Sequence, residues 1–139
     1  MFDEFVTFDI AKKLKDKGFK EPCFAYYTSS GSSLIFNKTP FRSGIVEDCL
    51  DSVNSLPIGC IGADFIDSPT ITQVLKWLRE DKGLYVDISL CKKGYYAIVY
   101  ETNFPDNKDY ANSWYIDGLS ETYEQTALDV IEYVLDNLI

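Results

Sequence analysis

The chain has 139 residues, of which 46% are hydrophobic and 15% aromatic, so it has enough apolar surface for one folded domain and is not expected to be disordered. It contains no histidine, which excludes Ser-His-Asp catalysis, histidine-bound metal ions and histidine pH switches. The formal net charge of -9 opposes binding to phosphate backbones.

The cysteines and the start of the chain bear on the compartment. No cysteine lies in a C-x-x-C pair, and we interpret all four as free thiols rather than disulfides or metal ligands. The first five residues carry early acids and no basic region, and no apolar run approaches the roughly 18 residues of a membrane span. We therefore expect a cytoplasmic protein without a signal peptide, membrane span, metal or cofactor. The cysteines are Cys23, Cys49, Cys60 and Cys91. Cys23 and Cys91 lie in or beside apolar runs, where a thiol behaves as a small buried hydrophobe.

The first elements are a helix and two strands. Thr7 can cap a helix that runs to about Lys17, and Gly18 supplies a left-handed stop. Residues 19–28 and 33–37 are rich in strand formers and are joined by a serine-rich turn. The next segment, 40–67, keeps neither a helical nor a strand period. There we expect irregular packed structure with at least one short element.

A helix followed by two strands forms the best-defined part of the pattern. Ser68 is the expected N-cap, Pro69 fits the first helical position and Gly83 ends the helix. Residues 84–90 then alternate apolar and polar, and 95–102 pair back as a hairpin. The helix face predicted to be buried consists of Ile71, Val74, Leu75, Trp77 and Leu78.

The last part of the chain reads as a loop over 104–117 and a C-terminal helix that starts at Ser120 or Thr122. Thr122 and Gln125 fit a capping box. The helix face predicted to be buried consists of Ala127, Ile131, Val134, Leu135 and Leu138.

The order of elements predicts the fold class. Residues 10–39 and 74–102 share the order helix, Lys-Gly stop, strand, turn, strand, which suggests a repeated helix-hairpin unit. We predict a single α+β domain over 1–139, with an antiparallel sheet of about four strands and about three helices.

Several strings resemble an uncharacterised family of small proteins from Bacteroides-type bacteria and their phages or mobile elements. The likeness covers most of the chain apart from 38–68 and 103–118. It implies a bacterial or phage-borne cytoplasmic protein, and it carries over no functional residue. The strings are Lys-Asp-Lys-Gly-Phe-Lys-Glu-Pro-Cys-Phe-Ala-Tyr-Tyr at 15–27, Pro-Thr-Ile-Thr-Gln-Val-Leu-Lys-Trp-Leu-Arg-Glu at 69–80, Tyr-Val-Asp-Ile, Gly-Tyr-Tyr-Ala-Ile-Val-Tyr and Tyr-Glu-Gln-Thr-Ala-Leu.

Aromatic side chains are the main candidates for function. A tyrosine pair in a strand places one ring on each sheet face, and if one face is open, its rings form a surface of the kind enriched in protein interfaces. Packing within the sheet is the alternative reading. The candidate interface residues are Tyr26, Tyr95, Tyr100, Trp114 and Tyr115. We therefore expect a non-enzymatic accessory protein that binds another protein or itself.

Two other functions stay open. A nucleic-acid-associated regulator would use the lysines of the first helix, although such a row is more often a solvated face. These are Lys12, Lys13, Lys15 and Lys17. An enzyme built on carboxylates and tyrosines is disfavoured because the chain has no catalytic motif. The acids at 47–67 could hold a divalent cation, but their spacing fits no EF-hand loop, so solvated loop acids are the favoured reading.

Overall fold

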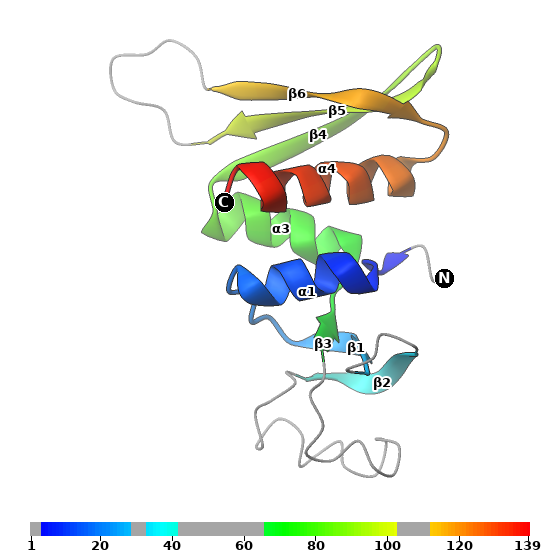
Figure 1. Cartoon of the computed structure of the whole chain (residues 1–139), viewed down its shortest axis with the longest axis vertical. Helices are drawn as coiled ribbons and strands as arrows, with labels where there is room; N and C mark the ends of the chain where they lie inside the picture. The colour runs from blue at the N-terminus through cyan, green and yellow to red at the C-terminus, as the bar shows by residue number, and fades with distance from the viewer. Residues whose placement is uncertain (1–3, 29–32, 42–65, 103–111) are drawn as a thin grey trace. The chain divides into compact units, whose positions relative to one another are not determined.

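The computed structural model describes residues 4–28, 33–41, 66–102 and 112–139 (Figure 1). Contacts group the chain into two compact units, Met1–Thr70 and Ile71–Ile139. The predicted α+β class is confirmed, because the described residues form three helices and six strands. One sheet of about four strands is not confirmed, since these strands form two separate three-stranded antiparallel sheets. The single domain over 1–139 stays a prediction.

The first unit consists of one helix and a small sheet. Its elements are α1 (Phe8–Asp16), β1 (Cys23–Tyr27), β2 (Leu34–Phe41) and β3 (Ile66–Ser68). The strand order is β2-β1-β3, and α1 packs beside β3. The serine-rich turn at 29–32 and most of the predicted irregular segment, 42–65, lie outside the described residues.

The helix α1 agrees with its prediction at both ends. The Thr7 hydroxyl accepts a hydrogen bond from the Ile10 backbone N–H at 3.4 Å, and Gly18 has a φ of 91°. These are the N-cap and the C-terminal glycine of positive φ that local chemistry favours at the two ends of a helix. The buried residues of the helix are Ile10, Ala11 and Leu14.

The predicted N-cap at Ser68 is wrong. Ser68 belongs to β3, opposite Ala25, and its hydroxyl donates to the Val6 carbonyl at 3.3 Å. The following helix, α3 (Ile71–Asp81), begins three residues later. Strand pairing with β1 uses the backbone that the capping motif would need, so this long-range contact overrides the local signal.

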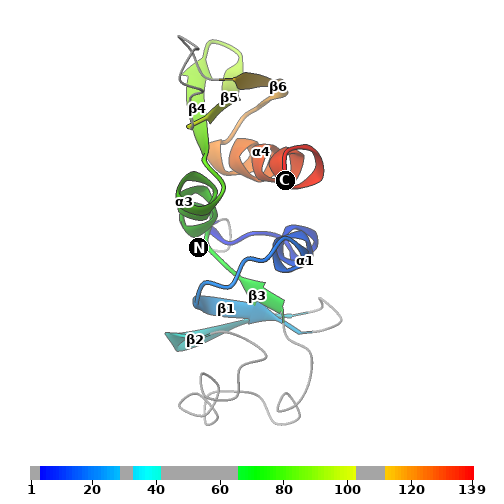
Figure 2. The same cartoon turned by 90° about the vertical axis from the view of Figure 1, so that its left-hand side faces the viewer.

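The second unit contains α3, a three-stranded meander and a C-terminal helix (Figure 2). Its other elements are β4 (Leu84–Cys91), β5 (Gly94–Glu101), β6 (Ser113–Ser120) and α4 (Tyr123–Asn137), and the strand order is β4-β5-β6. The hairpin β4–β5 agrees with the predicted strands. Gly83, at a φ of 66°, follows α3 as expected. The residues of α3 that are buried are Ile71, Val74, Trp77 and Leu78, whereas Leu75 is half-buried.

The third strand of this sheet corrects the predicted loop over 104–117. An Asp-Gly pair within β6 is typical of a turn, but here it lies at a break in the register. Tyr95 pairs with Ser120 and Ala97 with Ile116, so a three-residue stretch of β6 opposes a single residue of β5. A bulge thus absorbs residues whose propensity alone favours a turn. Residues 103–111 of that loop lie outside the described part of the chain.

The repeated helix-hairpin unit is not confirmed. In the first sheet the earlier strand of the hairpin, β1, is central, whereas in the second sheet the later strand, β5, is central. The third strands therefore join opposite sides of the two hairpins, which a simple repeat would not produce.

The cap of α4 follows half of the predicted capping box. The Thr122 hydroxyl accepts from the Gln125 backbone N–H at 3.1 Å, while the Gln125 side chain donates to Asp129 at 2.8 Å. Leu138 is only half-buried. The buried residues of α4 are Thr126, Ala127, Val130, Ile131, Val134 and Leu135.

Candidate functional site

One face of the second sheet is covered by α4. Val86 pairs with Val99 and Ile88 with Ala97, so these side chains point to the same side of the sheet. Ala97 and Val99 are buried, and α4 packs against all three strands (Figure 1, Figure 2). This covered face is the core of the second unit.

The other face of the second sheet, called here the open face, is covered by neither of the two helices of the second unit. Its most exposed rings are Tyr115, at 61%, and Tyr85, at 45%. A surface of this kind places apolar and aromatic atoms in water unless a partner covers them. The residues of the open face are Tyr85, Asp87, Ser89, Tyr96, Ile98, Tyr100, Ser113 and Tyr115.

The register places the aromatic rings of the open face next to one another. Tyr85 lies directly opposite Tyr100, and Ile98 of the central strand β5 lies opposite Asp87 of β4 and Tyr115 of β6. The rings of Tyr96 and Tyr115 stack, with centroids 6.0 Å apart and planes at 30°. Tyrosines on three adjacent strands therefore form one continuous surface around Ile98.

Asp87 is the one charged side chain among the described side chains of the open face. It lies opposite Ile98 and is half-buried. The Ser89 hydroxyl donates to its carboxylate at 3.4 Å. The described part of the chain contributes no cation to this carboxylate.

The five tyrosine and tryptophan candidates do not share one surface. Tyr100 and Tyr115 lie on the open face, as above. Tyr95 and Trp114 lie on the side covered by α4: Trp114 pairs with Val99, and the Tyr95 ring meets that of Tyr123 edge-on at 6.1 Å. Tyr26 is fully buried in the first unit, so it cannot contribute to such a surface.

Six of the eight residues of the open face were not among the sequence candidates, including Tyr85, Tyr96 and Asp87. The alternating pattern of β5 already put Tyr95 and Tyr96 on opposite faces. Which face is open depends on where α4 packs, and no local pattern carries that information.

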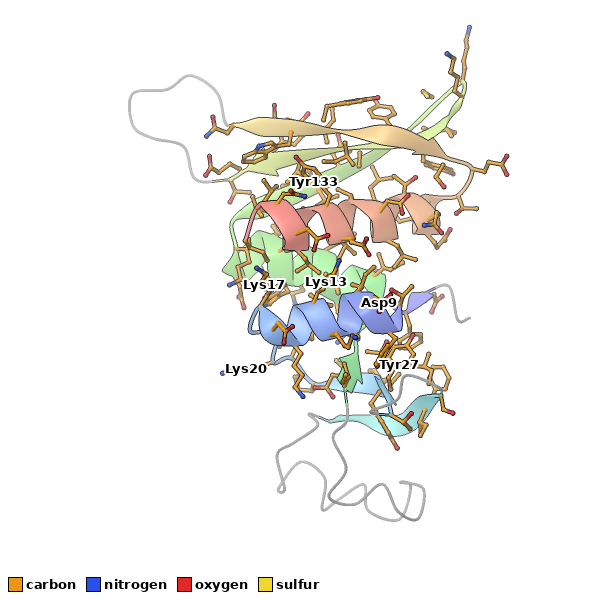
Figure 3. All side chains as sticks on the ribbon, viewed as in Figure 1. Asp9, Lys13, Lys17, Lys20, Tyr27 and Tyr133 are labelled. Carbon is orange, nitrogen blue, oxygen red and sulfur yellow. The ribbon has the colours of Figure 1, made fainter. Side chains whose placement is uncertain are left out.

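The lysine candidates of α1 are spread around the helix. At about 100° per residue, the four lysines cover roughly 200° of its circumference, with Asp9 and Asp16 exposed in the same arc. Figure 3 shows Asp9, Lys13 and Lys17 along α1 and Lys20 in the segment that follows. The Lys12 ammonium lies 4.9 Å from the centre of the Phe8 ring. Lys12, Lys13, Lys15 and Lys17 therefore form no concentrated basic face.

Two groups of the first unit have raised pKa values. Burial, and then the charges of Asp67 and Glu21, raise the pKa of the Cys23 thiol far above its usual range. The thiol donates to the Glu21 carbonyl at 3.3 Å. Burial raises the pKa of Tyr27 against a lowering by its hydrogen bond with Ser68. A thiol that keeps its proton is a poor nucleophile, so Cys23 has a structural role.

The remaining sequence candidates contribute no site in the described ranges. Cys91 is exposed rather than buried, because it lies at the end of the β4–β5 hairpin. The acids at 47–64 and two of the cysteines lie outside these ranges, and within them no three histidine, cysteine or carboxylate side chains form a metal-binding group. No helix of the described residues is long and apolar enough to cross a membrane.

In comparisons with family models, curated proteins and solved structures, none matches this chain.

Proposed function

We propose that this chain is a non-enzymatic accessory protein that binds another protein, and that the open face is the surface that contacts this partner. The observation that carries the proposal is the group of tyrosines on adjacent strands, with Tyr85 and Tyr115 exposed at 45% and 61%. Tyrosine is enriched in protein interfaces because a large, rigid ring contributes much contact area and its hydroxyl keeps a polar contact. We also propose a location in the bacterial cytoplasm, on the resemblance of its strings and on the interpretation of its cysteines as free thiols.

The nucleic-acid alternative receives less support. Its lysines are interspersed with Asp9 and Asp16, whereas a phosphate-binding helix concentrates its cations on one side. The open face carries a carboxylate, which repels phosphate.

The test is affinity capture from bacterial lysate with three forms of the full chain: the natural sequence, a Tyr85→Ser/Tyr115→Ser variant and a Phe24→Ser variant. Phe24 is the matched control, because it is an aromatic residue of similar exposure, 44%, on β1 of the first unit. Each capture is repeated after nuclease treatment. Circular dichroism checks that all three forms are folded.

We expect one or more proteins that are retained by the natural chain and by Phe24→Ser, resist nuclease, and are lost from the double variant. Retention by the double variant would refute the open face as the contact surface. Loss of all partners after nuclease treatment would favour the lysine helix instead.

A further inference from the structure

Asp87 indicates which chemistry the partner brings to the open face. Its carboxylate lies within a tyrosine-rich surface, with Tyr85 two residues before it on β4 and Ile98 directly opposite. The diagonal neighbours of a strand residue lie about 7–8 Å away, and here they are Tyr96 and Tyr100. Three tyrosines are therefore neighbours of this carboxylate in the register, one on its own strand and two at diagonal positions on β5.

We propose that the partner inserts an arginine side chain, whose guanidinium pairs with the Asp87 carboxylate and lies on the neighbouring tyrosine rings. This inference rests on the proposed function and names the chemistry of the partner. Arginine fits because its planar group donates two parallel hydrogen bonds to a carboxylate and also stacks on aromatic faces. A cation within about 6 Å of a ring centroid is attracted by the negative ring face.

The charge of the surrounding unit supports a basic partner. Residues 71–139 contain twelve acidic and six basic side chains, so the unit attracts cationic segments and repels acidic ones. In the described part of the chain the hydroxyl of Ser89 is the sole hydrogen-bond partner of the Asp87 carboxylate, which leaves this carboxylate with acceptor capacity for a guanidinium.

A second copy of the chain fits this face less well. Its own open face carries the same carboxylate and offers no cation among its described side chains. Two such faces would therefore bury a like charge from each copy, which is costly when neither is paired. Self-association thus becomes an outcome of the test rather than the proposal.

The test is an NMR titration of the full chain with three peptides of one design, acetyl-Gly-X-Gly-X-Gly-amide. X is arginine, lysine or citrulline, and citrulline has nearly the shape of arginine without its charge. We expect the arginine peptide to shift the ring signals of Tyr85, Tyr100 and Tyr115, the lysine peptide to bind more weakly, and the citrulline peptide to cause no shift. Asp87→Asn is expected to weaken arginine-peptide binding at least about tenfold, since hydrogen bonds to charged groups are among the stronger ones.

Glu121→Gln is the matched control, because it removes one negative charge from an exposed position between β6 and α4. It should leave the affinity within about twofold of the natural chain, since an exposed charge far from the contact is screened by salt. Equal binding of the arginine and citrulline peptides, or equal weakening by both variants, would overturn the arginine inference. So would ring shifts that depend on protein concentration and not on peptide.

The capture experiment separates this inference from the proposed function. A partner lost from Tyr85→Ser/Tyr115→Ser but fully retained by Asp87→Asn would refute the arginine and leave the protein-binding face standing. A partner retained by both variants would refute the proposed function itself. A partner lost from both variants and retained by Glu121→Gln would support both.

Discussion

The backbone of Val6 illustrates how a single residue links separate segments of the first unit. The Val6 carbonyl accepts from the Tyr27 hydroxyl at 2.9 Å and from the Ser68 hydroxyl at 3.3 Å. The backbone N–H of Val6 donates to the Pro69 carbonyl at 3.1 Å. These bonds tie the segment before α1 to β1 and β3, and each of them satisfies a polar group that would otherwise be costly to bury.

The raised pKa of Cys23 makes stability fall with alkaline pH. An unfolded thiol loses its proton near pH 8.5, whereas the buried thiol keeps it, so above that pH the folded state binds more protons than the unfolded state. The free energy of unfolding should therefore decrease above about pH 8.5, by at most about 1.4 kcal/mol per pH unit from this group. Tyr27 adds to the decrease above about pH 10, because its pKa is raised too.

Urea unfolding at pH 8, 9 and 10 measures this slope. Cys23→Ala should lower stability at pH 8 through lost packing, and it should also make the decrease between pH 8 and 10 shallower. Cys91→Ala, which removes an exposed thiol, should leave the slope unchanged. An identical slope for all three proteins would contradict the assignment to Cys23.

The β4–β5 hairpin depends on a glycine at its turn. Gly94 has a φ of 138°, and a Cβ added there would lie 2.6 Å from the Ser120 carbonyl oxygen of β6. Gly94→Ala should therefore cost about 2 kcal/mol or more, because both the backbone angle and the close approach disfavour a side chain. Since β6 carries Tyr115, the same change should also disturb the open face.

Gly18 offers a matched comparison for this element. It also has a positive φ, 91°, but an added Cβ would meet nothing within 4 Å. Gly18→Ala should lower the free energy of unfolding by only about 1 kcal/mol, which is the cost of a side chain at a positive φ without any close contact. Denaturant unfolding followed by circular dichroism measures both variants, and equal costs would show that the contact with Ser120 contributes nothing.

The charge of the whole molecule is expected to control its association. A formal net charge of -9 favours repulsion between copies at neutral pH, while several large hydrophobic side chains are exposed, among them Leu90 at 68%. Near the sequence pI of about 4.4 this repulsion vanishes. We expect light scattering at 0.15 M salt to rise sharply between pH 6 and pH 4.5 and to stay low at pH 7.5. Equal scattering at pH 4.5 and at pH 7.5 would show that charge does not control association.

Local chemistry is enough to predict the helices and the β4–β5 hairpin. Thr7 and Thr122 act as N-caps, Gly18 and Gly83 follow the helices they were expected to end, and the alternation of 84–90 marks a half-buried strand. These features involve residues a few positions apart, so the sequence alone carries them.

Long-range pairing decided the remaining features. The strand β3 has three residues and β6 contains a turn-like Asp-Gly pair, so each is a strand only because a neighbouring strand pairs with it.

The candidate site also depends on long-range packing and pairing. Alternation puts Tyr95 and Tyr96 on opposite faces, but only the packing of α4 decides which face is buried. Only the register between strands brings Asp87 among the tyrosines of the open face, because cross-strand neighbours are set by pairing and not by distance along the chain.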